Sequence, residues 1–286
     1  MSQLKDIKER IESIKKTRKM TQAMKMVAAA KFKRFSDQAV SSRDMIRTVN
    51  SLISLVAHQS NGLIDEELMQ SVESNTELII LITGDRGLCG GFNTNIIKSL
   101  KAYIGETEKN VDVIIFGRKG VQHFKRSQLN VIKTYENFQD KFELSKVEPV
   151  VDELIEIFKS KKYSNINLFY NEFKTAIASN LMNKQLFPVP CTDTTDANTE
   201  ENILIEPSPT QLLDNLSKQF VLFSLFSAFL ESSAAEQGAR MAAMDAATGN
   251  AGDMIGDLTL VYNRKRQAQI TTELTEIVAG AEALVM

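Results

Sequence analysis

The sequence predicts an α/β fold in which two long terminal helices pair as an antiparallel coiled coil beside a Rossmann-like α/β domain. Three observations predict it. No glycine precedes Gly62 and all five prolines lie between positions 149 and 209, so both ends of the chain lack strong helix breakers. Apolar residues recur at coiled-coil spacing in both end segments. The segment between them alternates short apolar runs with helical patterns, which is typical of parallel βαβ units.

These patterns divide the chain into three expected parts. An N-terminal coiled-coil helix is expected over residues 1–60, a Rossmann-like α/β domain over 75–205, and a C-terminal coiled-coil helix over 210–286. Two helices of this length need tertiary support, which each can give the other if the middle domain brings them together antiparallel.

The N-terminal helix has a seam that changes character along its length. Its apolar seam positions are Leu4, Ile7, Ile11, Ile14, Phe32, Phe35, Ile46, Val49, Ile53 and Val56. Between them the seam falls on Arg18, Thr21 and Lys25, while Met20, Met24 and Val27 occupy a phase one residue earlier. We therefore expect the middle of this helix to serve another partner.

The C-terminal helix carries a longer heptad. Its seam positions are Leu213, Leu216, Phe220, Phe223, Ser227, Leu230, Ala234, Gln237, Met241, Met244, Thr248, Ala251, Ile255, Leu258 and Tyr262. A four-residue stutter on residues 263–267 then unwinds the supercoil locally, before the pattern resumes at Ile270. Eight of the twenty residues 232–251 are alanine, which permits close approach of two backbones. At roughly 1.5 Å per residue, about 75 residues exceed about 60 by some 20 Å, so the C-terminal tip is expected to protrude unpaired.

The middle of the chain predicts alternating strands and helices. Strands are expected over 78–83, 111–116 and 165–173, helices over 94–103, 118–126 and 148–159, and an acidic, threonine-rich loop over 192–201. A strand, helix, strand, helix order indicates a compact domain with a parallel sheet.

Composition excludes several classes of protein. With 43% hydrophobic and 24% charged residues the chain is typical of globular proteins that bury a core. Its two cysteines, Cys89 and Cys191, show no CxxC and no ligand spacing to His58 or His123, so neither a disulfide framework nor a metal site is expected. The longest apolar stretch, 221–230, is too short to span a bilayer. Because no His, Cys or carboxylates converge by spacing, a catalytic site is not expected either.

A glycine-rich loop over residues 83–93 falls where a strand ends and a helix begins. Loops at such places often bind phosphate, but the spacing here matches neither G-x-G-x-x-G nor the P-loop. We therefore favour a structural loop in which Asp85, Arg86, Gly87, Gly90 and Gly91 provide a tight turn, an ion pair within the loop and close packing of helix on sheet. No cofactor is expected.

The N-terminal helix is locally basic although the net charge is −2. Residues 1–35 hold eleven Lys or Arg against three acids. A nucleic-acid-binding coiled coil is one interpretation of this cluster, but the intervening acids and the negative net charge count against it. A solvated helix face, or a face that meets acidic loops of a protein partner, remains open.

Three stretches taken together resemble the gamma subunit of F-type ATP synthase, the rotating central stalk. The first is Thr17, Thr21, Gln22, Ala23, Met24, Lys25, Met26, Val27, Ala28, Ala29 and Lys31. The second is Asp85, Arg86, Gly87, Leu88, Cys89, Gly90 and Gly91. The third, the most specific, is Glu236, Ala239, Arg240, Met241, Ala246, Ala247, Thr248, Asn250, Ala251, Asn263, Arg266, Gln267, Ala268, Ile270, Thr271, Glu273, Glu276, Ile277 and Val278. The chain departs from the family pattern at Met20, Gln22, Ala30, Gly84 and Ala235.

The resemblance implies a non-catalytic subunit of the proton-transporting ATP synthase complex. In the family the coiled coil turns inside the ring of alpha and beta subunits, and the α/β domain contacts the epsilon subunit and the c-subunit ring of the membrane sector. Ion translocation is thereby coupled to ATP synthesis or hydrolysis. The resemblance implies no cofactor and no nucleic acid. It implies a peripheral protein on the cytoplasmic side of the cell membrane, and the absence of a presequence favours a bacterial source.

The resemblance also implies roles for particular residues. Arg266 and Gln267, with Thr271 nearby, match polar contacts to a catch loop of a beta subunit. Met24 and Lys25, with Arg240, match positions that meet the acidic lever segment of beta. The tip over residues 270–286 matches a segment that turns within a hydrophobic collar. The competing interpretation from another class is a nucleotide- or metabolite-binding α/β enzyme with helical dimerisation arms.

Overall fold

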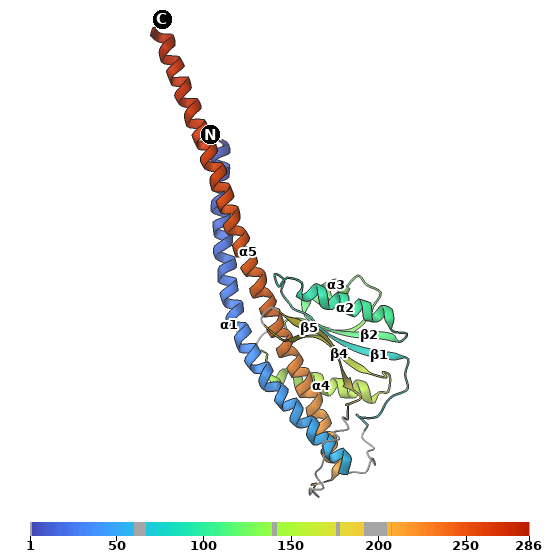
Figure 1. Ribbon diagram of the computed structural model, residues 1–286. Coiled ribbons are helices and arrows are strands. Elements are labelled where there is room, and N and C mark those ends of the chain that lie inside the picture. The colour runs from blue at the N-terminus through green and yellow to red at the C-terminus, as the bar shows by residue number, and fades with distance from the viewer. Residues whose placement is uncertain are drawn as a thin grey trace. The chain divides into compact units, whose positions relative to one another are not determined.

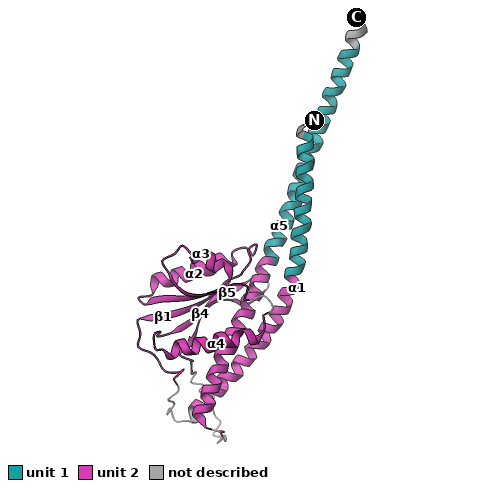
Figure 2. Cartoon of the chain, turned by 180° about the vertical axis from the view of Figure 1, so that it is seen from behind, with its two compact units in different colours: residues 1–28, 241–286 teal, residues 29–240 magenta. Residues whose placement is uncertain are grey.

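The computed structural model describes residues 2–59, 67–138, 142–175, 178–191, 205–206 and 208–285, and it divides into two compact units (Figure 2). Unit 1 comprises residues 1–28 and 241–286, and unit 2 comprises residues 29–240. Helices α1 (Ser2–Gln59) and α5 (Pro209–Val285) contribute to both units. The acidic loop expected over 192–201 and the side chain of His58 lie outside the described residues.

Unit 1 is an antiparallel pair of helices (Figure 1). Ile11 and Ala28 of α1 are buried in it, as are Met244 and Ala251 of α5. The buried face continues through the polar stretch, because Thr21 Oγ1 lies 2.7 Å from Thr248 Oγ1. Lys25 Nζ adds a 2.6 Å ion pair with Asp245. The same face of α1 therefore contacts α5 where the seam has no apolar residues, and polar pairs take their place.

Within unit 1, α5 continues beyond the N-terminal end of α1 (Figure 1). The part of α5 in this unit, 241–285, is longer than the part of α1, 2–28, so the C-terminal end of α5 extends past α1. Ile255, Leu258 and Tyr262 are half-buried, whereas Ile270 and Leu274 are exposed. The apolar stripe of α5 thus continues through Ile270 and Leu274, where α1 no longer covers it.

Unit 2 is built on a five-stranded sheet of order β3-β2-β1-β4-β5. The strands are β1 (Thr76–Ile82), β2 (Asn110–Phe116), β3 (Asn130–Tyr135), β4 (Ile166–Phe173) and β5 (Ser179–Phe187). The first four pair in parallel and β5 pairs antiparallel with β4. Two long terminal helices and a central mixed sheet confirm the predicted fold class.

The two outer strands are absent from the sequence-based prediction, which is a correction to it. β3 and β5 lie at the two edges of the sheet, and most of their residues are exposed or half-buried. Edge strands bury less than central strands, so their sequences lack the continuous apolar run that marks β1 and β2. The antiparallel edge also makes the sheet mixed instead of purely parallel.

Helices cover both faces of the sheet in unit 2 (Figure 1). One face packs on α2 (Phe92–Glu106) and α3 (Arg118–Phe124). The other packs on α4 (Leu144–Lys159) and on the parts of α1 and α5 that belong to unit 2. Buried strand residues alternate between the faces, for example Ile80 and Ile82 against Ile79 and Leu81, as the two-residue period of a strand requires.

None of the described helices combines the length and the apolar character that a bilayer crossing requires.

Candidate protein-interaction site

The glycine-rich loop connects β1 to α2 and is held by its own side chains. The Gly84 amide donates to Asn93 Oδ1 at 2.8 Å, and Asn93 Nδ2 lies 3.3 Å from the buried Cys89 sulfur. Gly90 and Leu88 both have positive φ, 55° and 61°. A positive φ is unfavourable for a residue as bulky as Leu88. The side chain of Leu88 is 65% exposed. The loop is therefore braced from within and presents an apolar side chain to its surroundings.

Helix α5 fixes this loop through a buried ion pair. Arg240 Nη2 donates to the Gly87 carbonyl at 3.3 Å and also bonds to Glu236, whose residue is 5% exposed. A Cβ at position 84 would lie 2.9 Å from Glu236 Oε2, so a larger residue there would require the Glu236 carboxylate to shift. Gly84 thus permits close packing of the start of the loop on α5, within unit 2.

Asp85 and Arg86 do not form the ion pair expected within the loop, which corrects that expectation. Asp85 Oδ1 accepts the backbone N–H groups of Arg118 and Asn137, both at 2.9 Å. Arg86 is exposed, and no carboxylate of the described residues pairs with it. Asp85 therefore organises neighbouring loops, and Arg86 adds a positive charge beside Leu88.

Burial sets the protonation preferences beneath the loop. It raises the pKa of the Glu236 carboxyl above its usual range, while Arg240 acts in the opposite direction. The more distant charges of Asp85 and Lys31 act on that pKa in opposite senses. Burial also raises the pKa of the Cys89 thiol, which favours the protonated, unreactive form. This chemistry suits a fixed support for the loop.

Arg240→Met tests this support. Without Arg240 the carboxylate of Glu236 is left buried and unpaired, so the free energy of unfolding is expected to fall by about 2–3 kcal/mol at neutral pH. This is less than the usual cost of breaking a buried ion pair, because the side chain of Arg240 is partly exposed. Since the pKa of Glu236 in the folded state is raised, the folded state is favoured below the unfolded pKa, and this advantage is lost as pH rises through the folded value. Urea titrations are expected to show that Arg240→Met loses more free energy of unfolding at pH 8 than at pH 5.

Lys25→Met is the matched control for that experiment. Its ion pair with Asp245 is exposed on both sides, so its loss is expected to cost less than about 1 kcal/mol and to be similar at the two pH values. An Arg240→Met variant with the same loss at both pH values would contradict the role assigned to Glu236.

The other candidate contact residues lie in unit 1. On α1, Met24 is exposed, whereas Lys25 is half-buried and pairs with Asp245. Arg266 and Gln267 are exposed on α5, where the Thr271 hydroxyl donates to the Gln267 carbonyl at 3.0 Å. The structure thus gathers Arg266, Gln267 and Thr271 on one stretch of helix, whereas Arg240 belongs to unit 2 and bonds to the loop.

Unit 1 exposes several large apolar side chains. On α1 they are Met20, Met24, Met26 and Val27, and on α5 they are Met254, Leu260, Val261, Ile270, Leu274, Ile277 and Val278. Large contiguous apolar surface on a water-exposed protein indicates an interface. Methionines suit such a surface, because their flexible side chains adapt to several partner geometries.

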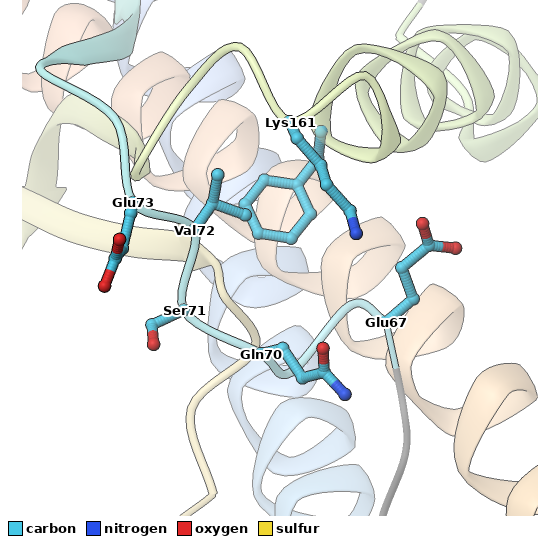
Figure 3. A pocket seen from close by; sticks show the side chains of 7 residues that line it. Glu67, Gln70, Ser71, Val72, Glu73 and Lys161 are labelled. Carbon is cyan, nitrogen blue, oxygen red and sulfur yellow. The ribbon is translucent and has the colours of Figure 1, made fainter.

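A cavity lies in unit 2, away from these apolar side chains (Figure 3). It measures ≈ 210 Å³ and is lined by Glu67, Gln70, Ser71, Val72, Glu73, Phe158 and Lys161. This is smaller than the ~300–1,000 Å³ of usual small-molecule sites. The described residues contain no group of three or more His, Cys, Asp or Glu that could hold a metal ion.

The fold and these surfaces are those of a coiled-coil protein with an α/β sheet and with exposed apolar side chains suited to protein contacts. Comparison with known proteins gives the family. The family model described as ATP synthase matches residues 3–284. Curated ATP synthase gamma chains from Pelagibacter ubique and Halothermothrix orenii are 40% and 41% identical, each alignment covering 99% of this chain and 100% of the relative.

Solved structures share the fold. A chain in the rotor of Euglena gracilis mitochondrial ATP synthase matches with a TM-score of 0.68 at 19% identity, covering 94% of this chain and 99% of that one. A chain of the central stalk and c-ring of Tetrahymena thermophila mitochondrial ATP synthase matches with a TM-score of 0.60 at 24% identity, covering 80% and 99%. This chain belongs to the ATP synthase gamma chain family, so it is a non-catalytic subunit of that complex.

Proposed function

We propose that the chain is the central rotating shaft of an F-type ATP synthase, transmitting torque between the ion-driven rotor ring and the alpha/beta catalytic hexamer. The observation that supports this most strongly is the apolar stripe of unit 1, which continues along α5 past the end of its partner helix. A helix that presents Leu274, Ile277 and Val278 to solvent needs a surrounding protein. A mainly apolar contact also offers few directional bonds to resist rotation.

The expected partners divide between the two units. Alpha and beta subunits surround the coiled coil of unit 1, and the α/β part of unit 2 contacts the epsilon subunit and the c-subunit ring. This arrangement makes the chain a peripheral membrane protein on the cytoplasmic side, in keeping with its bacterial relatives. In domain terms the proposal assigns residues 1–60 and 210–286 to the shaft and 75–205 to the part that contacts the ring.

Asymmetry gives the shaft its effect on catalysis. Three chemically identical beta subunits can adopt different conformations only if a partner interacts with each of them differently. Two paired helices of unequal length have no threefold symmetry. Each orientation of the shaft therefore favours a different beta subunit.

Six residues are proposed as the contacts to the catalytic hexamer. Arg266, Gln267 and Thr271 provide polar contacts to a catch loop of a beta subunit, because they are exposed within one and a half turns of α5. Met24, Lys25 and Arg240 face the acidic lever segment of beta. Arg240 would act there mainly by holding the loop of residues 83–93, since its guanidinium is already bonded to Gly87 and Glu236.

Co-purification tests the proposed function. An affinity tag on this chain is expected to recover alpha, beta and epsilon subunits in stoichiometric amounts from cells that express the full set. Recovery of the chain alone, or as a dimer that binds ATP or NAD tightly in equilibrium dialysis, would favour the metabolite-binding alternative. It would contradict the proposed function as a rotating shaft.

Arg266→Ala and Gln267→Ala test the catch-loop contacts. A charged hydrogen bond contributes about 1.5–3 kcal/mol, so its loss is expected to lower ATP-driven proton pumping by roughly tenfold. The circular dichroism of the isolated chain is expected to stay unchanged, because both side chains are exposed. Arg264→Ala, which removes an equally exposed charge from the same helix, is expected to have a smaller effect. Unchanged pumping in both variants would remove these residues from the contact set.

A further inference from the structure

A charge cluster around the buried carboxylate of Glu231 brings together four elements of unit 2. Arg43 comes from α1, Glu231 from α5, Glu172 from β4 and Lys184 from β5. Arg43 Nε donates to Glu231 Oε1 at 2.7 Å, and Arg43 Nη2 donates to the Phe173 carbonyl of β4 at 2.8 Å. One guanidinium therefore binds α1 to α5 and also to the end of a central strand.

Glu231 is the buried member of this cluster, whereas Arg43, Glu172 and Lys184 are half-buried. The side chain of Glu231 is 4% exposed and that of Arg43 34%. Burial raises the pKa of Glu231, and Arg43 opposes this. Burial lowers the pKa of Lys184, and Glu231 and Glu172 oppose that. The two cations thus compensate the two carboxylates, Glu172 and the buried Glu231.

Stability alone is a weak reason for such a cluster. Replacing a buried ion pair by apolar residues of similar volume is often neutral or stabilising, because desolvation offsets the attraction. Glu231 Oε2 also has no hydrogen-bond partner within the part of the chain that the structure describes, which adds to that cost. What the pair adds to the packed apolar core around it is direction, since a guanidinium with two fixed acceptors holds their relative orientation.

Further contacts between α1, α5 and β4 lie near the Arg43–Glu231 pair. Next to it along the seam, Ser42 Oγ donates to Ser227 Oγ at 2.9 Å, and the rings of Phe32 and Phe173 meet edge to face at 5.3 Å. Around Arg43, therefore, hydrogen bonds and a ring contact join α1 to α5 and to β4.

We propose that Arg43 is a positioning residue that locks α1 and α5 to the sheet of unit 2 against torsion, so that torque applied to the sheet passes into the two helices. This inference rests on the proposed function as a rotating shaft. It concerns the stiffness of the joint and not the contacts with the catalytic hexamer.

The test uses the assembled ATP synthase in sealed vesicles, with ATP hydrolysis and proton pumping measured together against an increasing proton gradient. The variant is the double substitution Arg43→Met with Glu231→Met, which removes both charges at similar volume and is expected to leave the urea midpoint of the chain close to wild type. The expected result is unchanged hydrolysis with a loss of protons pumped per ATP that grows with the opposing gradient. Arg43→Lys with native Glu231 keeps the pair and is expected to recover part of that loss.

Arg47→Met is the matched control, because Arg47 lies one turn away on α1 and its ion pair with Asp44 is exposed on both sides. It is expected to pump like the wild type. A double variant with the wild-type ratio of pumping to hydrolysis would overturn the proposal. So would an equal fall in both activities or a failure to assemble, because either shows a merely structural role. If the wild-type chain itself fails to assemble with the other subunits, the proposed function fails first, separately from this inference.

Discussion

Replacing Gly117 with alanine is expected to prevent unit 2 from reaching its native fold. Gly117 follows β2 with φ 98°, which L side chains rarely adopt. An added Cβ would lie 2.0 Å from the Thr83 carbonyl oxygen, and a backbone atom cannot move aside as a flexible side chain can. Thr83 is itself fixed, because its amide bonds to the Phe116 carbonyl at 2.8 Å and its hydroxyl accepts the Gly120 amide at 2.9 Å.

The expected loss exceeds about 4 kcal/mol, which is a large part of the stability of a typical domain. Urea unfolding followed by circular dichroism measures it. Gly105→Ala is the matched control, since a Cβ there meets nothing within 4 Å and alanine favours the helix α2. We expect that variant to be as stable as the wild type or slightly more stable. A Gly117→Ala chain with a wild-type urea midpoint would show that the ends of β1 and β2 do not pack as described.

Phe229→Ala has the second largest expected effect. Phe229 of α5 is fully buried, and its ring lies 4.9 Å from that of Phe116, 5.0 Å from that of Phe138 and 5.2 Å from that of Phe142. Truncating a buried phenylalanine removes its transfer free energy and leaves a cavity, at a cost of about 3–5 kcal/mol. Because the four rings join α5 to β2, the loss is expected in the unfolding of unit 2.

Leu260→Ala is the comparison for this effect. Leu260 is 71% exposed on the same helix, so its loss is expected to change the free energy of unfolding by no more than about 0.5 kcal/mol. Urea midpoints of the two variants are expected to differ clearly. Similar midpoints would mean that the aromatic cluster contributes little to the attachment of α5 to the sheet.

The long helices and the central strands could be predicted from the sequence for a simple physical reason. Missing helix breakers and a regular seam are properties of the sequence itself, so α1 and α5 begin and end close to the expected positions. β1 and β2 are buried on both faces and show continuous apolar runs. β3 and β5 were not predicted. In an edge strand such as Ser179–Phe187, apolar residues are interspersed with polar ones, so the sequence resembles a loop.

The candidate site was less predictable, because its contacts join residues far apart in sequence. The partners Arg43 and Glu231 are 188 positions apart, and neither lies in a distinctive motif. Likewise Arg240 gave no indication from spacing that it would bind the Gly87 carbonyl. The loss of apolar phase near Thr21 did identify a special region, but pairing of Thr21 with Thr248 needed the structure.

Rotation is the most direct test of the shaft itself. A fluorescent rod attached to the α/β part of unit 2, with the alpha/beta hexamer fixed to a surface, reports movement of this chain while ATP is hydrolysed. The account predicts that the rod turns continuously in one direction and stops when ATP is exhausted. A rod that stays at one angle while hydrolysis proceeds would contradict it.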